Sequence, residues 1–190
     1  MKRIYLIPIL ALQILPLQAR QPEKGYRGFI EWSNDMRRPE YYYFGKETQI
    51  FSGISTSHGY QINPDLFVGA GVAIELHSNN GTQNWLVPLF AQIRTDRKWG
   101  DFTPFGDLRV GYSAVSGSDR GFFLSPSIGY RFNWGRKAGL NIGLGWTMKT
   151  YRDMQYSLVY DEVNNTPNFI ENGKTNYTSN YLTLRIGFDF

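Results

Sequence analysis

Residues 66–76 read LFVGAGVAIEL, a strict alternation of two kinds of side chain. The even positions, from Leu66 to Leu76, are all aliphatic, whereas the odd positions are aromatic, small or acidic. Successive side chains of a β-strand point to opposite faces, so this segment predicts a strand with one continuously apolar face. The other face carries Glu75 and two glycines and is of mixed polarity.

The same two-residue period recurs in seven further segments, which predicts eight strands in all. They span residues 26–32, 50–62, 85–94, 104–112, 122–132, 140–149 and 182–190. The segment 50–62 is the weakest, because Ser52, Thr56 and His58 occupy positions that are aliphatic or aromatic in the other strands. Strands of about 9 to 11 residues match a tilted crossing of a bilayer and exceed the usual length in soluble proteins.

The connections between these segments differ in length. Short turns are expected at residues 63–65, 97–102 and 133–138, and the two longest connections are loop 1, residues 34–49, and loop 4, residues 152–180. Short periplasmic turns and longer outer loops are typical of outer-membrane barrels. We therefore expect an all-β fold, an eight-stranded antiparallel up-and-down transmembrane β-barrel with long outer loops 1 and 4.

The N-terminus has the pattern of a secretory signal. Lys2 and Arg3 precede an apolar stretch, residues 4–17, and Ala19 precedes an abrupt change to polar residues. The stretch is too short and too interrupted by proline for a membrane-spanning helix. We expect residues 1–19 to be a signal peptide, residues 20–24 a short leader and residues 25–190 the barrel.

Composition excludes several classes of function. Cysteine is absent, which removes disulfides, thiolate metal sites and a cysteine nucleophile. Loss of Lys2 and Arg3 with the signal peptide would lower the formal charge from +4 to +2, too weak a balance for nucleic-acid binding. No cofactor motif or metal-ligand spacing occurs, so we expect no cofactor and no metal. Aromatic residues reach 16%, which favours a lipid-facing surface.

Three segments and the C-terminus carry a family resemblance. The segments are Ser57–Pro64, Pro104–Tyr112 and Ser125–Phe132, and the chain ends in Phe190, two residues after Phe188. Together with the eight alternating strands, they resemble the small outer-membrane β-barrel proteins of Gram-negative bacteria, porin-like barrels of the OmpA/OmpX type. The resemblance covers residues 25–190. It implies an outer-membrane location and a terminal strand, ending at Phe190, that the barrel-insertion machinery reads; it implies no particular activity.

The interior of an eight-stranded barrel is just wide enough for its own side chains. Alternation places ten charged residues inside, six basic and four acidic, and we expect them to form ion networks that close the lumen. They are Arg27, Glu31, Glu75, Arg94, Asp107, Arg109, Arg131, Lys149, Arg185 and Asp189. The expected result is a closed, non-enzymatic barrel with a mild positive excess inside.

Aromatic residues cluster where the expected strands end. An aromatic ring with one polar atom is suited to the headgroup boundary of a bilayer, so we predict two aromatic girdles. Their members are Trp32, Trp85, Trp99, Tyr112, Tyr130, Trp134, Trp146, Phe188 and Phe190.

Loops 1 and 4 are the candidate binding surface. Tyrosine and arginine offer large contact area, and closure of the barrel would bring the two loops to the same side. The candidate residues are Arg37, Arg38, Tyr41, Tyr42, Tyr43, Tyr156 and Tyr160. Residues 154–160 also alternate, so the last two strands could continue as a hairpin whose edge accepts a partner strand. We expect structural support or recognition of an extracellular ligand or membrane-protein partner.

Three alternatives stay open at this stage. A porin-like channel would conduct small solutes or ions. A lipid-modifying enzyme would use His77 with Glu75 and Ser78, since a histidine, a hydroxyl and a carboxylate near the outer leaflet could perform acyl transfer. A soluble exported barrel of the lipocalin type would have the opposite polarity, with the aliphatic face inside.

Overall fold

The computed structural model of this chain describes residues 24–37, 40–42, 45–47, 50–79, 82–97, 102–114, 121–134, 138–161 and 166–190. The predicted signal peptide lies outside these residues. So do three of the predicted site residues, Arg38, Tyr43 and Trp99. Within the described ranges, no helix is long and apolar enough to cross a membrane.

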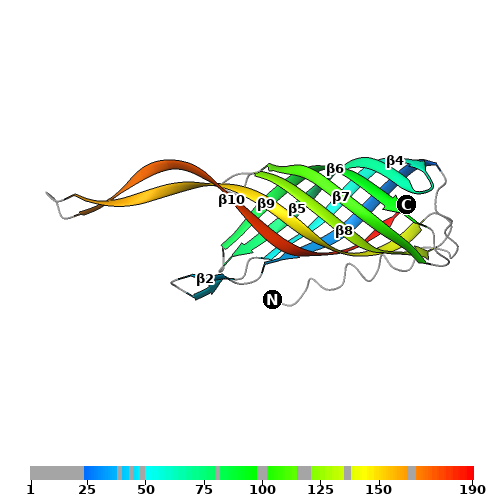
Figure 1. Cartoon of the computed structure of the whole chain (residues 1–190), viewed down its shortest axis with the longest axis horizontal. Coiled ribbons are helices and arrows are strands. Elements are labelled where there is room, and N and C mark those ends of the chain that lie inside the picture. The colour runs from blue at the N-terminus through cyan, green and yellow to red at the C-terminus, as the bar shows by residue number, and fades with distance from the viewer. Residues whose placement is uncertain are drawn as a thin grey trace.

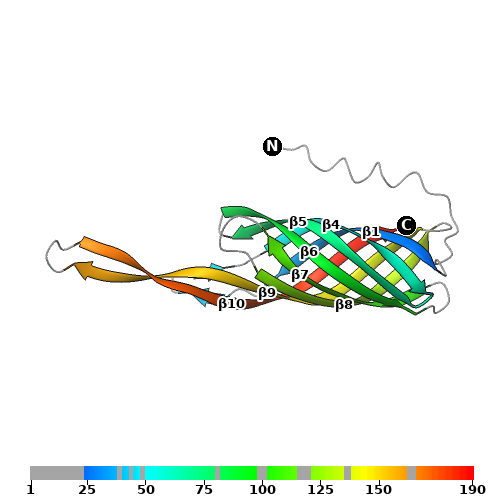
Figure 2. The same cartoon turned by 90° about the horizontal axis from the view of Figure 1, so that it is seen from above.

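Eight strands form one closed antiparallel barrel (Figures 1 and 2). The barrel strands are β1 (Gly25–Met36), β4 (Ile50–Asn63), β5 (Leu66–Asn79), β6 (Thr82–Asp96), β7 (Phe102–Ala114), β8 (Gly121–Trp134), β9 (Ala138–Asp161) and β10 (Thr166–Asp189). A separate two-stranded sheet pairs β2 (Glu40–Tyr42) with β3 (Gly45–Glu47). Each barrel strand pairs with the next one along the chain, and β10 pairs with β1. The predicted eight-stranded up-and-down topology is therefore confirmed.

The last residue takes part in closing the barrel. Phe29 lies opposite Asp189 in the β1–β10 register. Beyond that pair, the backbone N–H of Gly28 donates to the carbonyl of Phe190 over 2.9 Å, and the N–H of Phe190 donates to the carbonyl of Gly28 over 3.0 Å. A Cβ atom on Gly28 would lie 2.8 Å from the Phe190 ring, so the ring packs directly over this glycine. The C-terminal aromatic residue thus joins the two ends of the sheet.

The predicted loop 4 is largely strand. β9 and β10 are 24 residues long each and stay paired up to Asp161 and from Thr166, so the expectation of a loop at residues 152–180 is wrong. The two strands run on as a twisted ribbon well past the rest of the barrel (Figures 1 and 2). We call residues 150–161 and 166–178 the ribbon; it is roughly 40 Å long at about 3.3 Å per residue. The alternation of side-chain types at residues 154–160 had indicated that the last two strands could continue as such a hairpin.

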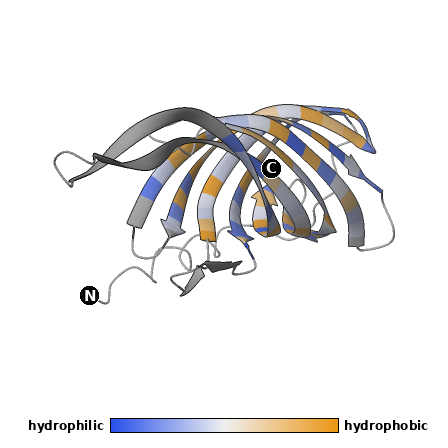
Figure 3. Ribbon diagram, turned by 60° about the vertical axis from the view of Figure 1, so that its left-hand side comes forward, coloured by the Kyte–Doolittle hydropathy of each residue, from blue (hydrophilic) through white to orange (hydrophobic). Residues whose placement is uncertain are grey.

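Hydrophilic and hydrophobic residues alternate along the barrel strands (Figure 3), and the burial of their side chains places polar residues inside and apolar residues outside. Exposed aliphatic side chains occur on every barrel strand, with Ile128 73% and Leu144 53% exposed, whereas Arg27 and Arg94 are fully buried. The β4 register follows the predicted parity, with Phe51 and Gln61 inside. Aliphatic residues thus cover the outside of this barrel, the reverse of a lipocalin-type barrel.

Three polar residues lie on the outer face of β4: Ser52, Thr56 and His58. Each of them forms a hydrogen bond with another residue of the same chain. Ser52 accepts a hydrogen bond from Trp32 Nε1 over 3.0 Å, and the Thr56 hydroxyl donates to the Phe29 carbonyl over 3.2 Å. The His58 ring lies between the hydroxyls of Tyr26, 2.5 Å away, and Thr56, 2.9 Å away. These polar atoms therefore have partners without a second protein.

Small inward residues make room for aromatic rings. A Cβ atom on Gly71 would lie 2.5 Å from the Phe90 ring and 2.6 Å from the Thr56 carbonyl oxygen. We expect Gly71→Val to lower the free energy of unfolding by about 1–3 kcal/mol, because the ring and the neighbouring strand must both shift. Urea unfolding of the purified barrel measures it. Ala70→Val, on the exposed face of the same strand, is the matched control and should unfold like the wild type.

Candidate functional site: the charged lumen

Among the described residues, twelve charged side chains form ion pairs inside the barrel, six of them basic and six acidic. They are Arg27, Glu31, Asp35, Glu75, Arg94, Asp96, Asp107, Arg109, Arg131, Lys149, Arg185 and Asp189. The ten predicted residues are among them, and Asp35 and Asp96 join them, so that bases and acids are equal in number within these ion pairs. Asp35 and Asp96 continue the inward parity of their strands, which was the available sequence signal.

The end of the barrel that holds Phe190 and the Pro64–Asp65 turn, called here the short-turn end, contains three arginines and two aspartates. Arg27 Nε lies 3.0 Å from Asp189, and Arg131 Nε lies 2.8 Å from the same carboxylate. Asp96 pairs with Arg27 and with Arg94 Nε, the latter over 2.8 Å. All five side chains are buried, so each carboxylate bridges two guanidinium groups without water between them.

A layer of phenylalanine rings separates this cluster from the centre of the lumen. Phe29 and Phe67 meet edge to face, with ring centroids 5.0 Å apart. The Arg94 guanidinium carbon lies 3.6 Å from the centroid of Phe105 and 5.0 Å from that of Phe29. Stacking on an aromatic face stabilises a guanidinium group that is no longer in contact with water.

The central layer holds two arginines and two acids. Asp107 accepts from Arg109 Nε over 3.0 Å and from Arg185 Nη1 over 2.9 Å. Arg109 also pairs with Glu31 across the barrel, and Gln92 donates to Asp107. The charges in this layer balance. Because a buried charge is costly unless it is paired, the mutual pairing is what allows four ionised groups to remain inside.

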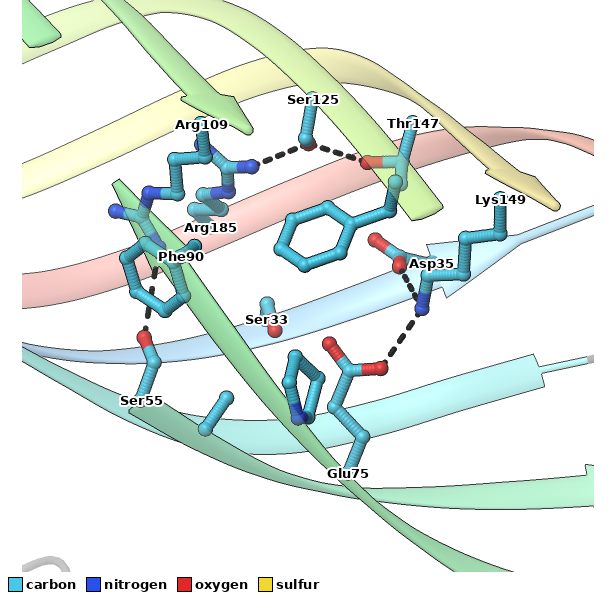
Figure 4. A pocket seen from close by; sticks show the side chains of 13 residues that line it. Ser33, Asp35, Ser55, Glu75, Phe90, Arg109, Ser125, Thr147, Lys149 and Arg185 are labelled. Atoms are coloured by element: carbon cyan, nitrogen blue, oxygen red, sulfur yellow. Dashed lines mark hydrogen bonds and ion pairs between the residues drawn. The ribbon is translucent and has the colours of Figure 1, made fainter. Parts of the chain in front are cut away.

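The opposite end, called here the hairpin end because the ribbon rises from it, has one base between two acids. Lys149 Nζ lies 2.7 Å from Asp35 and 2.8 Å from Glu75 (Figure 4). It also lies 3.9 Å from the centroid of the Phe51 ring. Lys149 therefore ties β9 to β1 and β5 across the lumen.

One small cavity lies between the central layer and Lys149 (Figure 4). Its volume is about 30 Å³, and its lining includes Ser33, Ser55, Phe90 and Thr147. That is room for about one water molecule. Beyond it, Phe51, Leu86 and Tyr181 pack into a buried apolar cluster.

The three residues of the enzyme alternative are not brought together. His77 is buried and stacks on Phe51, with ring centroids 4.0 Å apart. Glu75 is paired with Lys149, and Ser78, the next residue after His77, lies on the other face of β5. Among the described residues, no group of three or more metal-binding side chains occurs.

Six residues of the predicted aromatic girdles have exposed rings in the structure. Trp32, Trp85, Tyr112 and Trp146 are exposed towards the hairpin end, and Tyr130 and Phe190 are exposed towards the short-turn end. Phe188 is partly buried. Two predicted members, Trp99 and the side chain of Trp134, lie outside the described set.

The predicted binding residues divide between two elements. Tyr41 and Tyr42 belong to β2, and the backbone of Tyr156 and Tyr160 belongs to the ribbon. Arg37 Nη1 donates to Ser179 Oγ over 3.0 Å, which ties the start of loop 1 to the base of the ribbon on β10.

The β9–β10 pairing has a register shift near the tip of the ribbon. It falls between Glu171 and Gly173, and on its tip side Leu158 lies opposite Phe169 and Tyr160 lies opposite Pro167.

Fold and site together define a class: a closed eight-stranded antiparallel β-barrel with a balanced ion network inside and an aliphatic exterior. No protein-family model matches the chain, and no curated protein matches it either.

Proposed function

We propose that this protein is an integral outer-membrane β-barrel, exported by its N-terminal signal and inserted with the aid of its C-terminal strand. The inverted polarity carries this proposal. An aliphatic exterior such as that formed by Val72, Leu144 and Leu184 is stable in acyl chains and poorly suited to water. The exposed aromatic residues near both strand ends fit headgroup boundaries.

Spin labels in lipid vesicles test this location. Labels at Val72, Leu144 and Leu184 are expected to report hydrocarbon, because these side chains face outwards. A label on Asp65, in the exposed turn between β4 and β5, is the control and should report water. Water contact at Val72, Leu144 and Leu184 as well would make the protein a soluble exported barrel.

We further propose that the barrel neither conducts nor catalyses, and that its extracellular elements serve support or recognition. Three charged layers and two apolar layers fill the lumen, which leaves about one water's volume near Lys149. Recognition then belongs to the ribbon and to residues 37–49. The ribbon supports this assignment because its two backbone edges pair with no other described strand and its sequence is rich in tyrosine.

Photo-crosslinking in intact cells tests recognition by the ribbon. A photoreactive residue at Val159, near the ribbon tip, is expected to form adducts with an extracellular ligand or membrane-protein partner. The same residue at Ser78, on the barrel rim, is the control and should form none. Absence of adducts from Val159 would leave structural support as the function.

A further inference from the structure

The charges of the lumen balance overall but not at each end. The short-turn end has Arg27, Arg94 and Arg131 against Asp96 and Asp189, whereas the central layer has two charges of each sign. The hairpin end has one base and two acids. Eight residues of a tilted strand separate Asn141 from Lys149, so the two ends lie roughly 20 Å apart. Within salt-bridge distance, the short-turn cluster thus has three bases and two acids, and Asp107, opposite Arg94 in the strand register, is already paired with Arg109 and Arg185.

The same three arginines each have one nitrogen without a partner. These atoms are Arg27 Nη2, Arg94 Nη1 and Arg131 Nη2, all of them buried, and within the described part of the chain none has a hydrogen-bond acceptor. Buried donors are almost always bonded, so three on one cluster call for a group that is not part of the chain. Water would satisfy the N–H groups. Only an anion would satisfy both the N–H groups and the excess charge.

Among the described residues, aromatic rings cover the cluster on the side of the lumen centre. Phe29, Phe67 and Phe105 cover it towards the centre of the lumen. Towards the short-turn mouth, Arg131 Nη1 donates to Asn133, whose side chain is exposed. An anion would therefore enter through the short-turn mouth.

We propose that the short-turn end of the lumen binds one small inorganic anion, of the size of chloride, through the unpartnered N–H groups of Arg27, Arg94 and Arg131. Small size follows from the complete burial of the three side chains. The bound anion makes this layer neutral, as the central layer already is. The proposed function, a barrel that neither conducts nor catalyses, does not by itself require this ion.

Anion-dependent stability tests this site. Thermal unfolding of the purified protein in detergent is followed by tryptophan fluorescence while sodium chloride replaces sodium gluconate at constant ionic strength. Because an ion that binds only the folded state stabilises it, we expect the melting temperature to rise by roughly 5 °C over a hundredfold range of chloride. Equal melting temperatures in the two salts would overturn the proposal.

Two variants locate the effect. Arg131→Gln leaves two bases against two acids at the short-turn end and is expected to abolish the chloride dependence. Arg109→Gln removes a base from the central layer and should retain it. A chloride effect that persists unchanged in Arg131→Gln would place the ion elsewhere and contradict the proposal.

A direct measurement does not depend on the stability of the variants. Crystals of the unaltered protein grown with bromide are expected to show an anomalous peak within hydrogen-bond distance of Arg131 Nη2. Its absence at this position, with ordered arginine side chains, would overturn the site.

Discussion

Asp107→Asn is expected to lower the free energy of unfolding by about 3–5 kcal/mol, the cost of removing one partner from a buried ion network. Asparagine keeps the shape of the side chain but leaves Arg109 and Arg185 with Glu31 as their only acid in the central layer. Urea unfolding in detergent or lipid vesicles, followed by tryptophan fluorescence, measures the loss. The control Asp65→Asn, in an exposed turn, should change stability by no more than about 0.5 kcal/mol.

A second variant separates charge balance from general damage. Arg185→Gln added to Asp107→Asn restores equal numbers of bases and acids in the central layer. We expect the double variant to recover much of the lost stability, since coupled charges are not additive. An Asp107→Asn barrel that unfolds at the wild-type urea concentration would show that the ion network contributes little.

Leu144→Arg is the second substitution with a large expected effect, a loss of about 2–4 kcal/mol in lipid vesicles, as for a lipid-facing charge at the bilayer midplane. Leu144 is 53% exposed and lies opposite Ile128, which is 73% exposed, on the middle part of the aliphatic wall. In water the same exposed substitution would change stability by about 0.5 kcal/mol or less. Unfolding in vesicles therefore distinguishes a membrane barrel from a soluble one.

The matched control places the same arginine near the expected membrane boundary. Thr178 is exposed and pairs with Thr150 where the ribbon begins. Thr178→Arg should cost no more than about 1 kcal/mol, because the penalty falls towards the interface. Equal, small effects at both positions would contradict the proposed outer-membrane location.

Strand number and side-chain orientation could be predicted from local sequence. The alternation at residues 66–76 and in the seven other segments assigned each side chain to one of two faces, and the burial of Phe67, Arg94 and Asp107 agrees with it. The prediction works because alternation is a property of the extended backbone itself. It was incomplete at strand ends: Asp35 and Asp96 share the inward parity but lie at or beyond the ends of the predicted strands.

The pairing of β9 and β10 in the ribbon could not be predicted from local sequence alone. The predicted strands ended at residue 149 and resumed at residue 182, so residues 152–180 were expected to form a loop, yet the backbone stays paired over most of this range. The shift between Glu171 and Gly173 has no signature in the alternation of β10 alone, since it is defined by pairing with β9. Its consequence, the placement of Phe169 opposite Leu158, depends on both strands.

By itself, the sequence determined which side chains enter the lumen, because each strand alternates independently of its neighbours. Only the tertiary structure decided which charges meet, because closure and strand stagger set the level of every residue along the barrel axis. Arg27 and Asp189 are 162 positions apart in the chain, yet they lie 3.0 Å apart once β10 pairs with β1. The uneven division of a balanced set of charges between the two ends, with three arginines left to share two aspartates, follows from that stagger.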